Sequence, residues 1–185
     1  LIHEHGDSMP PEQFSKFLTN ITQDADRLKT LVSRLLELAR ADVMQPREEQ
    51  TELAGLLYDL QQYYQDKIQV SGNAADTVLP LPADITRTIL GNLIENSFQH
   101  GATEIAVEAS TAPNSMTLIL TDNGRGISAA NAEKLFTPFF TTKRDQGGTG
   151  LGLVVIRSLL AAYRGKIRCI PTIHGACFEI RLPLN

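Results

Sequence analysis

The feature that most constrains the fold is a long helical repeat near the start of the chain. Between Pro11 and about Val43, apolar side chains recur at alternating spacings of four and three residues: Phe14, Leu18, Ile21, Ala25, Leu28, Val32, Leu35 and Ala39. A period of about 3.5 residues is typical of the seam of a coiled coil or helix bundle, and it predicts one continuous helix. Pro10 and Pro11 suit the first turn of such a helix, and Pro46 follows its end.

The apolar stripe of this helix is wider than a two-stranded coiled coil would bury. A second row of apolar side chains widens the first: Phe17, Ile21, Leu28, Leu31, Leu35 and Leu38. A four-helix bundle buries such a stripe, so we expect partner helices from upstream chain, from a second copy, or from both. The alternative is a surface helix that packs on its own globular domain.

Composition and charge narrow the class of protein. Of the 185 residues, 42% are hydrophobic and 21% charged, which is typical of a folded globular chain and excludes disorder and collagen. The net charge of −4 lacks the basic excess of a nucleic-acid binder, so we expect no nucleic-acid partner. No apolar run reaches the roughly 20 residues of a membrane span, and Cys169 and Cys177 are too few for a disulfide framework. With so few cysteines we expect a cytoplasmic setting. Because the chain begins with Leu, we also expect it to be a piece of a longer protein, with any membrane attachment in the other parts.

The residue pattern divides the chain into a helical region, residues 1–46, and a second domain, residues 47–185. In the second domain it predicts helices over 51–65, 82–100, 128–136 and 150–163, and strands over 67–70, 77–79, 105–109, 116–120, 166–170 and 177–182. Most strands are joined as hairpins rather than by β-α-β crossovers. The expected fold is therefore α/β, a two-layer sandwich of a mixed sheet with helices on one face.

Polar residues gather at two places in this second domain. Asn92, Asn96 and His100 are spaced by four residues, so they share one face of a predicted helix. The run Asp122-Asn123-Gly124-Arg125-Gly126 directly follows a predicted strand. Each motif has an ordinary alternative: the first could be the solvated face of a helix, and the second a common turn.

A glycine-rich stretch at the start of a helix is a third candidate site. Gly147-Gly148-Thr149-Gly150-Leu151-Gly152 allows close approach of the backbone to a ligand, and N–H groups at a helix start favour phosphate. It lacks the Lys of a P-loop and the leading strand of a dinucleotide site. The stretch before it carries Phe136, an aromatic anchor for a loop, and Lys143 and Arg144, which could reach phosphates or simply be solvated.

In their order and spacing, these motifs resemble the N, G1, F and G2 boxes of sensor histidine kinases. The ATP-binding domain of that family belongs to a superfamily shared with gyrase-type, chaperone and mismatch-repair ATPases. Gly175-Ala176-Cys177-Phe178 is similar to its closing strand, and the end of the first helix, residues 35–41, resembles the second helix of its dimerisation and phosphoacceptor hairpin. The resemblance implies a Bergerat-type ATP-binding fold, a homodimer formed through the first helix, and a response-regulator receiver domain as partner.

The resemblance also implies roles for individual residues. Asp122 corresponds to the adenine reader, because a carboxylate accepts from the amino group of adenine, and Asn96 corresponds to the Mg²⁺ ligand. Asn92 stands where hydrolysing relatives carry a glutamate; an amide cannot act as a general base, which favours phosphoryl transfer over hydrolysis. Lys143 and Arg144 are the catalytic candidates for contact with the γ-phosphate. The other expected nucleotide contacts are His100, Gly124, Gly126, Phe136, Gly148, Thr149, Gly150, Leu151 and Gly152.

Some residues depart from the family pattern or take no part in it. Many members carry, at the place of Gln99, a Lys that would contact phosphate, so Lys143 or Arg144 would have to supply that positive charge. A hydroxyl often found in the closing strand is replaced by Ala176. Neither His3 nor His5 has both the acidic neighbour and the proline of the His-box, so we expect the acceptor histidine to lie outside this sequence. Glu95, rotated about 100° from Asn96 on an ideal helix, is interpreted as structural.

We therefore expect the catalytic part of an ATP-dependent protein-histidine kinase of a two-component system. It would bind Mg²⁺-ATP and transfer the γ-phosphoryl group to a histidine, for relay to an aspartate of a response regulator. The alternative is a nucleotide-dependent switch or binding module, or an anti-sigma-type serine kinase of the same superfamily. The long helix discriminates between them, because serine-kinase relatives normally lack it.

Overall fold

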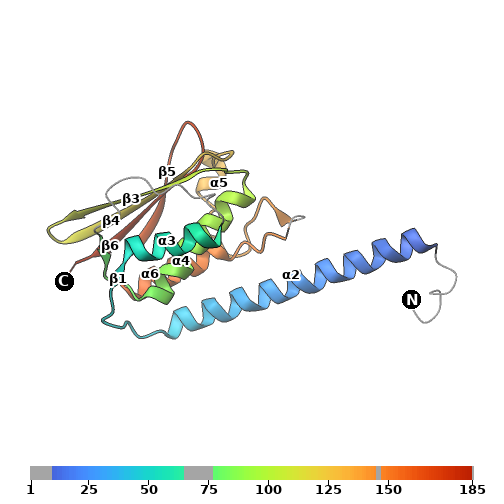
Figure 1. Cartoon of the computed structure of the whole chain (residues 1–185), viewed down its shortest axis with the longest axis horizontal. Coiled ribbons are helices and arrows are strands. Elements are labelled where there is room, and N and C mark those ends of the chain that lie inside the picture. Colours follow the sequence, from blue (N-terminus) through green and yellow to red (C-terminus); the bar gives the residue numbers. More distant parts are fainter. Residues whose placement is uncertain (1–9, 65–76, 145–146, 185) are drawn as a thin grey trace.

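The computed structural model describes residues 10–64, 77–144 and 147–184. Figure 1 shows a long helix, α2 (Pro11–Val43), that extends away from an α/β domain. The elements of that domain are, in chain order, β1 (Thr51–Glu52), α3 (Leu53–Tyr63), β2 (Val78–Leu79), α4 (Ala83–Gln99), β3 (Ile105–Ala112), β4 (Ser115–Asp122), α5 (Ala129–Ala132), α6 (Gly152–Ala162), β5 (Lys166–Ile170) and β6 (Cys177–Pro183). The prediction of one continuous helix from Pro11 to about Val43 is confirmed.

The main sheet has the strand order β3-β4-β6-β5, and every neighbouring pair in it is antiparallel. The expected α/β architecture is confirmed, but the expectation of a mixed sheet is wrong for the described strands. Two hairpins explain the difference: β3 turns directly into β4, β5 turns into β6, and the hairpins join through β4 and β6. Strands β4 and β5 run in the same direction, but β6 lies between them, so they do not pair.

Some element boundaries differ from the sequence prediction. The helix expected over 51–65 begins at Leu53, because Thr51 and the following residue form strand β1 and pair with β2. The helix expected over 128–136 is only the four-residue α5, with Ser128 as its N-cap. The helix expected over 150–163 begins at Gly152. The strand expected over 67–70 lies outside the described residues.

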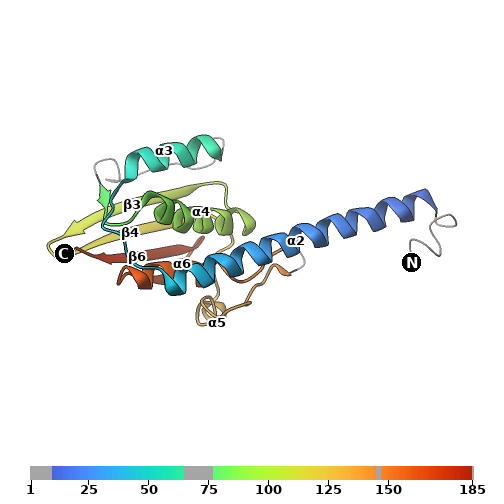
Figure 2. The ribbon, with the colours of Figure 1, turned by 90° about the horizontal axis from the view of Figure 1, so that it is seen from below.

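The hydrophobic core lies between the sheet and a layer formed by helices α3, α4 and α6. Alternate strand residues are buried in it, as the two-residue period of a strand requires: Val107, Leu118, Leu120, Phe178 and Ile180. The helices contribute Leu57, Ile89, Leu93, Val155 and Leu159. Figures 1 and 2 show the helices on one side of the sheet. This packing fixes the C-terminal end of α4 beside the end of β4, where the polar motifs lie.

Helix α2 contacts the domain from about its middle, at Arg27, to its C-terminal end. There it contacts α6, Ala41 is buried, and Leu38 packs against the core. Much of the predicted stripe is not covered by the described residues: Phe14, Leu18, Ile21, Leu28, Val32 and Leu35 are exposed. Figure 2 shows the N-terminal part of α2 projecting beyond the domain. The alternative of a surface helix packed on its own domain therefore holds for the C-terminal half of α2, from about Arg27 onward.

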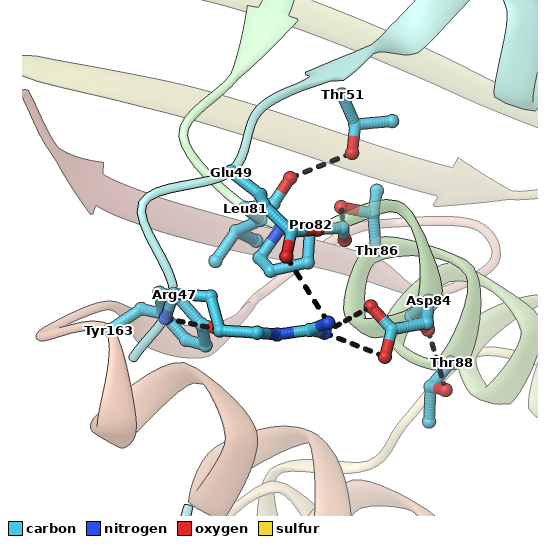
Figure 3. A network of polar contacts seen from close by, with 9 residues as sticks. All are labelled: Arg47, Glu49, Thr51, Leu81, Pro82, Asp84, Thr86, Thr88 and Tyr163. Carbon is cyan, nitrogen blue, oxygen red and sulfur yellow. Dashed lines mark hydrogen bonds and ion pairs between the residues drawn. The ribbon is translucent and has the colours of Figure 1, made fainter. Parts of the chain in front are cut away.

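An ion-pair cluster fastens the linker after α2 to the domain (Figure 3). The Arg47 guanidinium donates to both carboxylate oxygens of Asp84, at 2.6 and 2.8 Å, and lies 3.3 Å from Glu49. Asp84 lies in the first turn of α4, where the helix dipole favours a carboxylate. The backbone N–H of Arg47 donates to the Tyr163 hydroxyl at 3.3 Å, at the end of α6. We call this cluster the linker clamp; it ties the exit of α2 to two helices of the core.

Candidate functional site

A cavity of about 190 Å³ opens where α4, the end of β4, the glycine-rich loop and α2 meet. Nine of the residues given a catalytic, nucleotide-binding or metal role from the sequence line it: Asn92, Asn96, His100, Asp122, Gly126, Gly148, Thr149, Gly150 and Gly152. Five others lie outside its wall: Gly124, Phe136, Lys143, Arg144 and Leu151. The structure thus brings motifs from three separate parts of the sequence to one pocket.

Asp122 is the buried carboxylate of the pocket. It ends β4, is only 6% exposed, and accepts three hydrogen bonds. Its Oδ1 accepts the backbone N–H groups of Gly124 and Ala176, at 2.9 and 3.0 Å, while its Oδ2 accepts the Ser97 hydroxyl at 2.7 Å. Buried carboxylates need such partners, and these three fix both oxygens in place. Oδ2, with a single partner, retains acceptor capacity for a ligand.

The two loops that hold Asp122 come together at Gly175. This residue has φ +67°, and a Cβ there would lie 1.6 Å from the backbone oxygen of Asp122. Only glycine permits both the conformation and the approach. The backbone N–H of Asp122 in turn donates to the Ala176 carbonyl at 2.9 Å. The ordinary turn expected as an alternative for residues 122–126 therefore serves here to shape one wall of the pocket.

The polar stripe of α4 faces the pocket rather than solvent, which excludes the solvated-face alternative. Asn92 is only 6% exposed, and its Nδ2 donates to the Thr88 carbonyl at 2.8 Å. Its Oδ1 faces the start of α6, where a Cβ at Gly152 would lie 3.0 Å away. At the other end of the stripe, burial lowers the pKa of His100, and the charges of Lys143 and Arg125 lower it further, against the opposing effect of Asp122. Burial and these cations therefore favour the neutral form of His100.

The loop before α6 is held by its own backbone. The Gly148 N–H donates to the Lys143 carbonyl at 3.0 Å, and the Lys143 N–H donates to the Thr141 hydroxyl at 3.0 Å. Phe136 lies against Arg157, whose guanidinium carbon is 5.9 Å from the ring centroid. The apolar residues that line the cavity are instead Ile127, Leu135, Phe140, Leu153 and Ala176.

Helix α2 supplies part of the pocket wall, which the sequence analysis did not anticipate. Thr30 and Arg34 both line the cavity. Arg34 Nη2 lies 2.8 Å from Glu95 Oε2, and Arg34 Nη1 lies 3.1 Å from Glu37 Oε2. Glu95, interpreted from the sequence as structural, thus also lines the cavity and pairs with the helix that crosses it. Nothing in the local pattern signals this pair, because its members are 61 positions apart.

Ser97 is a second residue that the sequence analysis did not single out. It is 1% exposed and directly follows Asn96 on α4. Its hydroxyl is the side-chain partner of Asp122, at 2.7 Å. The sequence did offer one sign of its role, because Ser97 is a small hydroxyl residue directly after Asn96 in the motif that contains the two asparagines.

Comparison with known proteins agrees with this geometry. Residues 82–185 match the family described as Histidine kinase-, DNA gyrase B-, and HSP90-like ATPase. Over 178 residues the chain is 35% identical to Sensor histidine kinase ZraS of Escherichia coli O157:H7, which covers 89% of this chain and 37% of that protein. The chain therefore spans well under half the length of this relative.

Solved structures share the fold. The histidine kinase ThkA in complex with the response regulator protein TrrA has a TM-score of 0.73 at 22% identity, over 100% of this chain and 55% of that chain. Full-length ShkA in complex with AMPPNP has a TM-score of 0.72 at 21% identity, over 97% of this chain and 40% of that chain. At these identities the likeness is one of architecture.

Proposed function

Because the chain belongs to the Histidine kinase-, DNA gyrase B-, and HSP90-like ATPase family, we propose that its pocket binds Mg²⁺-ATP for phosphoryl transfer to a histidine. The observation that carries this proposal is the fixed carboxylate of Asp122 at one side of a cavity that Asn96 and the glycine-rich loop also line. The solved ShkA structure contains AMPPNP, an ATP analogue, which supports a nucleotide in a pocket of this architecture.

Asp122 would recognise the base. Its Oδ1 already accepts two backbone N–H groups, so Oδ2 is the atom with capacity for a further donor. The exocyclic amino group of adenine is such a donor, whereas guanine presents a carbonyl oxygen at the same edge. The carboxylate therefore favours ATP over GTP.

The other end of the pocket would hold the phosphates and the metal ion. Described residues contain no cluster of three or more His, Cys, Asp or Glu suited to a metal, so the Asn96 amide oxygen and the phosphates themselves would be the ligands. That oxygen-rich, weakly charged set fits Mg²⁺. Bound Mg²⁺ would neutralise charge that develops on the transferring phosphoryl group. Gly148, Thr149 and Gly150 would bring backbone near the phosphates, with Lys143 and Arg144 on the same loop.

The chemistry would be transfer rather than hydrolysis. Asn92 has its Nδ2 engaged with the Thr88 carbonyl, and an amide oxygen cannot remove a proton from water. The unprotonated ring nitrogen of a histidine can attack with its own lone pair as ADP leaves, and the other ring nitrogen releases its proton only after the transfer. His3 and His5 lie outside the described residues, and we propose that the acceptor belongs to the hairpin helix that pairs with α2.

The rest of the proposal concerns assembly and setting. Residues 1–46 would form part of a dimerisation bundle, because α2 exposes its apolar stripe, and residues 47–185 would form the nucleotide domain. The ThkA structure contains a response regulator, which supports such a protein as partner here. Among the described helices, none has the length and apolar character to cross a membrane. A cytoplasmic setting follows from the proposed kinase activity, since ATP is supplied there.

The test is incubation of the chain with γ-labelled ATP, with and without a separately prepared piece of the same protein that contains the hairpin helix with the His-box. We expect acid-labile, alkali-stable label on the added helix, as for a phosphoramidate. A helix with its histidine replaced by glutamine, and the chain with Asn96→Ala, are the controls and should give no label. Acid-stable label on a partner would favour the serine kinase instead. Rapid phosphate release without protein label would contradict transfer and reveal an ATPase.

A further inference from the structure

Arg34 of α2 lies at the end of the pocket where we propose that the phosphates bind. Its side chain is only 18% exposed, and it lines the same cavity as Asn92 and Asn96. The C-terminal end of α4 lies beside Asp122, the proposed reader of the base. The His100 carbonyl at this end accepts the backbone N–H of Arg125, in the loop that follows Asp122. Residues earlier in α4 therefore lie farther from the base and closer to the proposed phosphates. Glu95, the partner of Arg34, is five positions earlier than His100, roughly 7 Å along the helix.

The present partners of Arg34 leave it free to bind a phosphate. It meets Glu37 and Glu95 through one nitrogen each, so the guanidinium fork has further N–H donors. The Glu95 side chain is 47% exposed, and exposed ion pairs contribute little stability. A phosphate group can accept two hydrogen bonds from a guanidinium, whereas Arg34 makes only one to Glu95. Exchange of Glu95 for a phosphate is therefore favourable.

Two further contacts keep α2 within reach of the pocket. The linker clamp ties its C-terminal exit to α4 and α6 (Figure 3). Nearer the N-terminus, the Arg27 guanidinium donates to the backbone carbonyl of Arg144 in the loop before α6. Arg34 lies between these two attachments, so the helix presents it to the pocket in a defined position.

We propose that Arg34 is a nucleotide-binding residue that exchanges Glu95 for the terminal phosphate of ATP. This inference rests on the proposed function, and it adds a residue from the bundle helix to the site. Base and phosphates would be read by different regions of the chain, the base by Asp122 and the terminal phosphate by Arg34. ADP lacks that phosphate and would leave the Arg34–Glu95 pair intact.

The experiment compares the calorimetric affinity of the chain for Mg²⁺-ATP and for Mg²⁺-ADP. Arg34→Ala should weaken ATP binding about 10- to 100-fold, as expected for a lost charge-assisted contact, and leave ADP binding within about twofold. The matched control is Arg87→Ala, which removes an ion pair of similar length, 2.8 Å to Asp59, outside the pocket lining. That control should change neither affinity.

A double variant separates contact from simple repulsion, because Arg34→Ala leaves the Glu95 carboxylate unpaired beside the phosphates. If Arg34 binds phosphate, the Arg34→Ala/Glu95→Gln variant stays selectively weak for ATP. Return of the double variant to wild-type ATP affinity would overturn the inference, as would equal losses for ATP and ADP or no loss at all. Failure of the wild-type chain to bind either nucleotide would instead refute the proposed function itself.

Discussion

Replacing Asp122 by asparagine makes the two terminal atoms of this side chain chemically different, and the structure determines which atom goes where. The Oδ1 position accepts two backbone N–H groups, from Gly124 and Ala176, which can only donate. The amide oxygen of asparagine must therefore occupy that position, and Nδ2 takes the place of Oδ2. Rotation of the amide, which would let it serve either base, is opposed by two buried backbone donors left without an acceptor.

The fold should tolerate this change. The hydrogen bonds to Oδ1 persist, and the Ser97 hydroxyl, which donates to Oδ2 at 2.7 Å, can reorient and accept from Nδ2 instead. We expect the free energy of unfolding to fall by about 1 kcal/mol, the size of one ordinary hydrogen bond. Urea denaturation of Asp122→Asn and of the exposed control Asp59→Asn measures it.

Nucleotide binding should change much more. In the variant, Nδ2 points a donor at the donor amino group of adenine, so a charge-assisted bond of about 1.5–3 kcal/mol is lost and ATP affinity falls roughly 10- to 150-fold. GTP, with a carbonyl oxygen at that edge, should lose less, so the ratio of ATP to GTP affinity must fall. Calorimetric titration with both nucleotides gives the ratio. An unchanged ratio in a folded variant would refute the assignment of Oδ2 as the base reader.

Three further predictions use other parts of the structure. Gly175→Ala should destabilise the fold by several kcal/mol or prevent folding, because its Cβ would lie 1.6 Å from the Asp122 backbone oxygen; thermal unfolding followed by circular dichroism tests this, and a near-native Tm would contradict it. Burial is the main cause of the lowered pKa of His100, so this residue binds fewer protons in the folded than in the unfolded chain, and the free energy of unfolding should fall as the pH drops below about 6.5. His100→Gln should flatten that dependence in urea denaturation measured at about pH 7.5 and about pH 5.5. The chain should self-associate through α2, and Leu28→Glu with Val32→Glu should reduce the mass seen by light scattering; a strict monomer before substitution would count against the bundle.

Periodic and local signals predicted much of the fold. The bounds of α2 follow from its apolar spacing, and the strands follow from alternation, because both patterns repeat over many residues. Pairing direction did not follow, since it depends on which hairpin lies beside which. Two-residue strands such as β1 carry too few residues for a period, so Thr51 was placed in a helix.

The residues of the candidate site also fall into those that local sequence signals predicted and those that only tertiary packing brings to the pocket. Asn92, Asn96 and Asp122 were found because spacing or a strand end marks them, and they all line the cavity. The Arg34–Glu95 pair was not, because only tertiary packing brings α2 across the pocket. Leu151 and Phe136 were chosen by their place within motifs, and the structure places them outside the cavity wall.

Because the linker clamp lies at one end of α2, a tilt of the helix about the clamp moves each residue by an amount that increases with its distance from the clamp. The helix has 33 residues and is therefore about 50 Å long, and the clamp holds it near one end. A tilt of about 10° about the clamp would carry the far end through roughly 9 Å but Arg34, about 14 Å from the pivot, through only about 2 Å. That smaller motion still exceeds what a hydrogen bond tolerates. Such a tilt would first have to break the Arg27–Arg144 contact, after which a large displacement of the N-terminal end of α2 would become a small one that opens or closes the Arg34–Glu95 contact at the pocket.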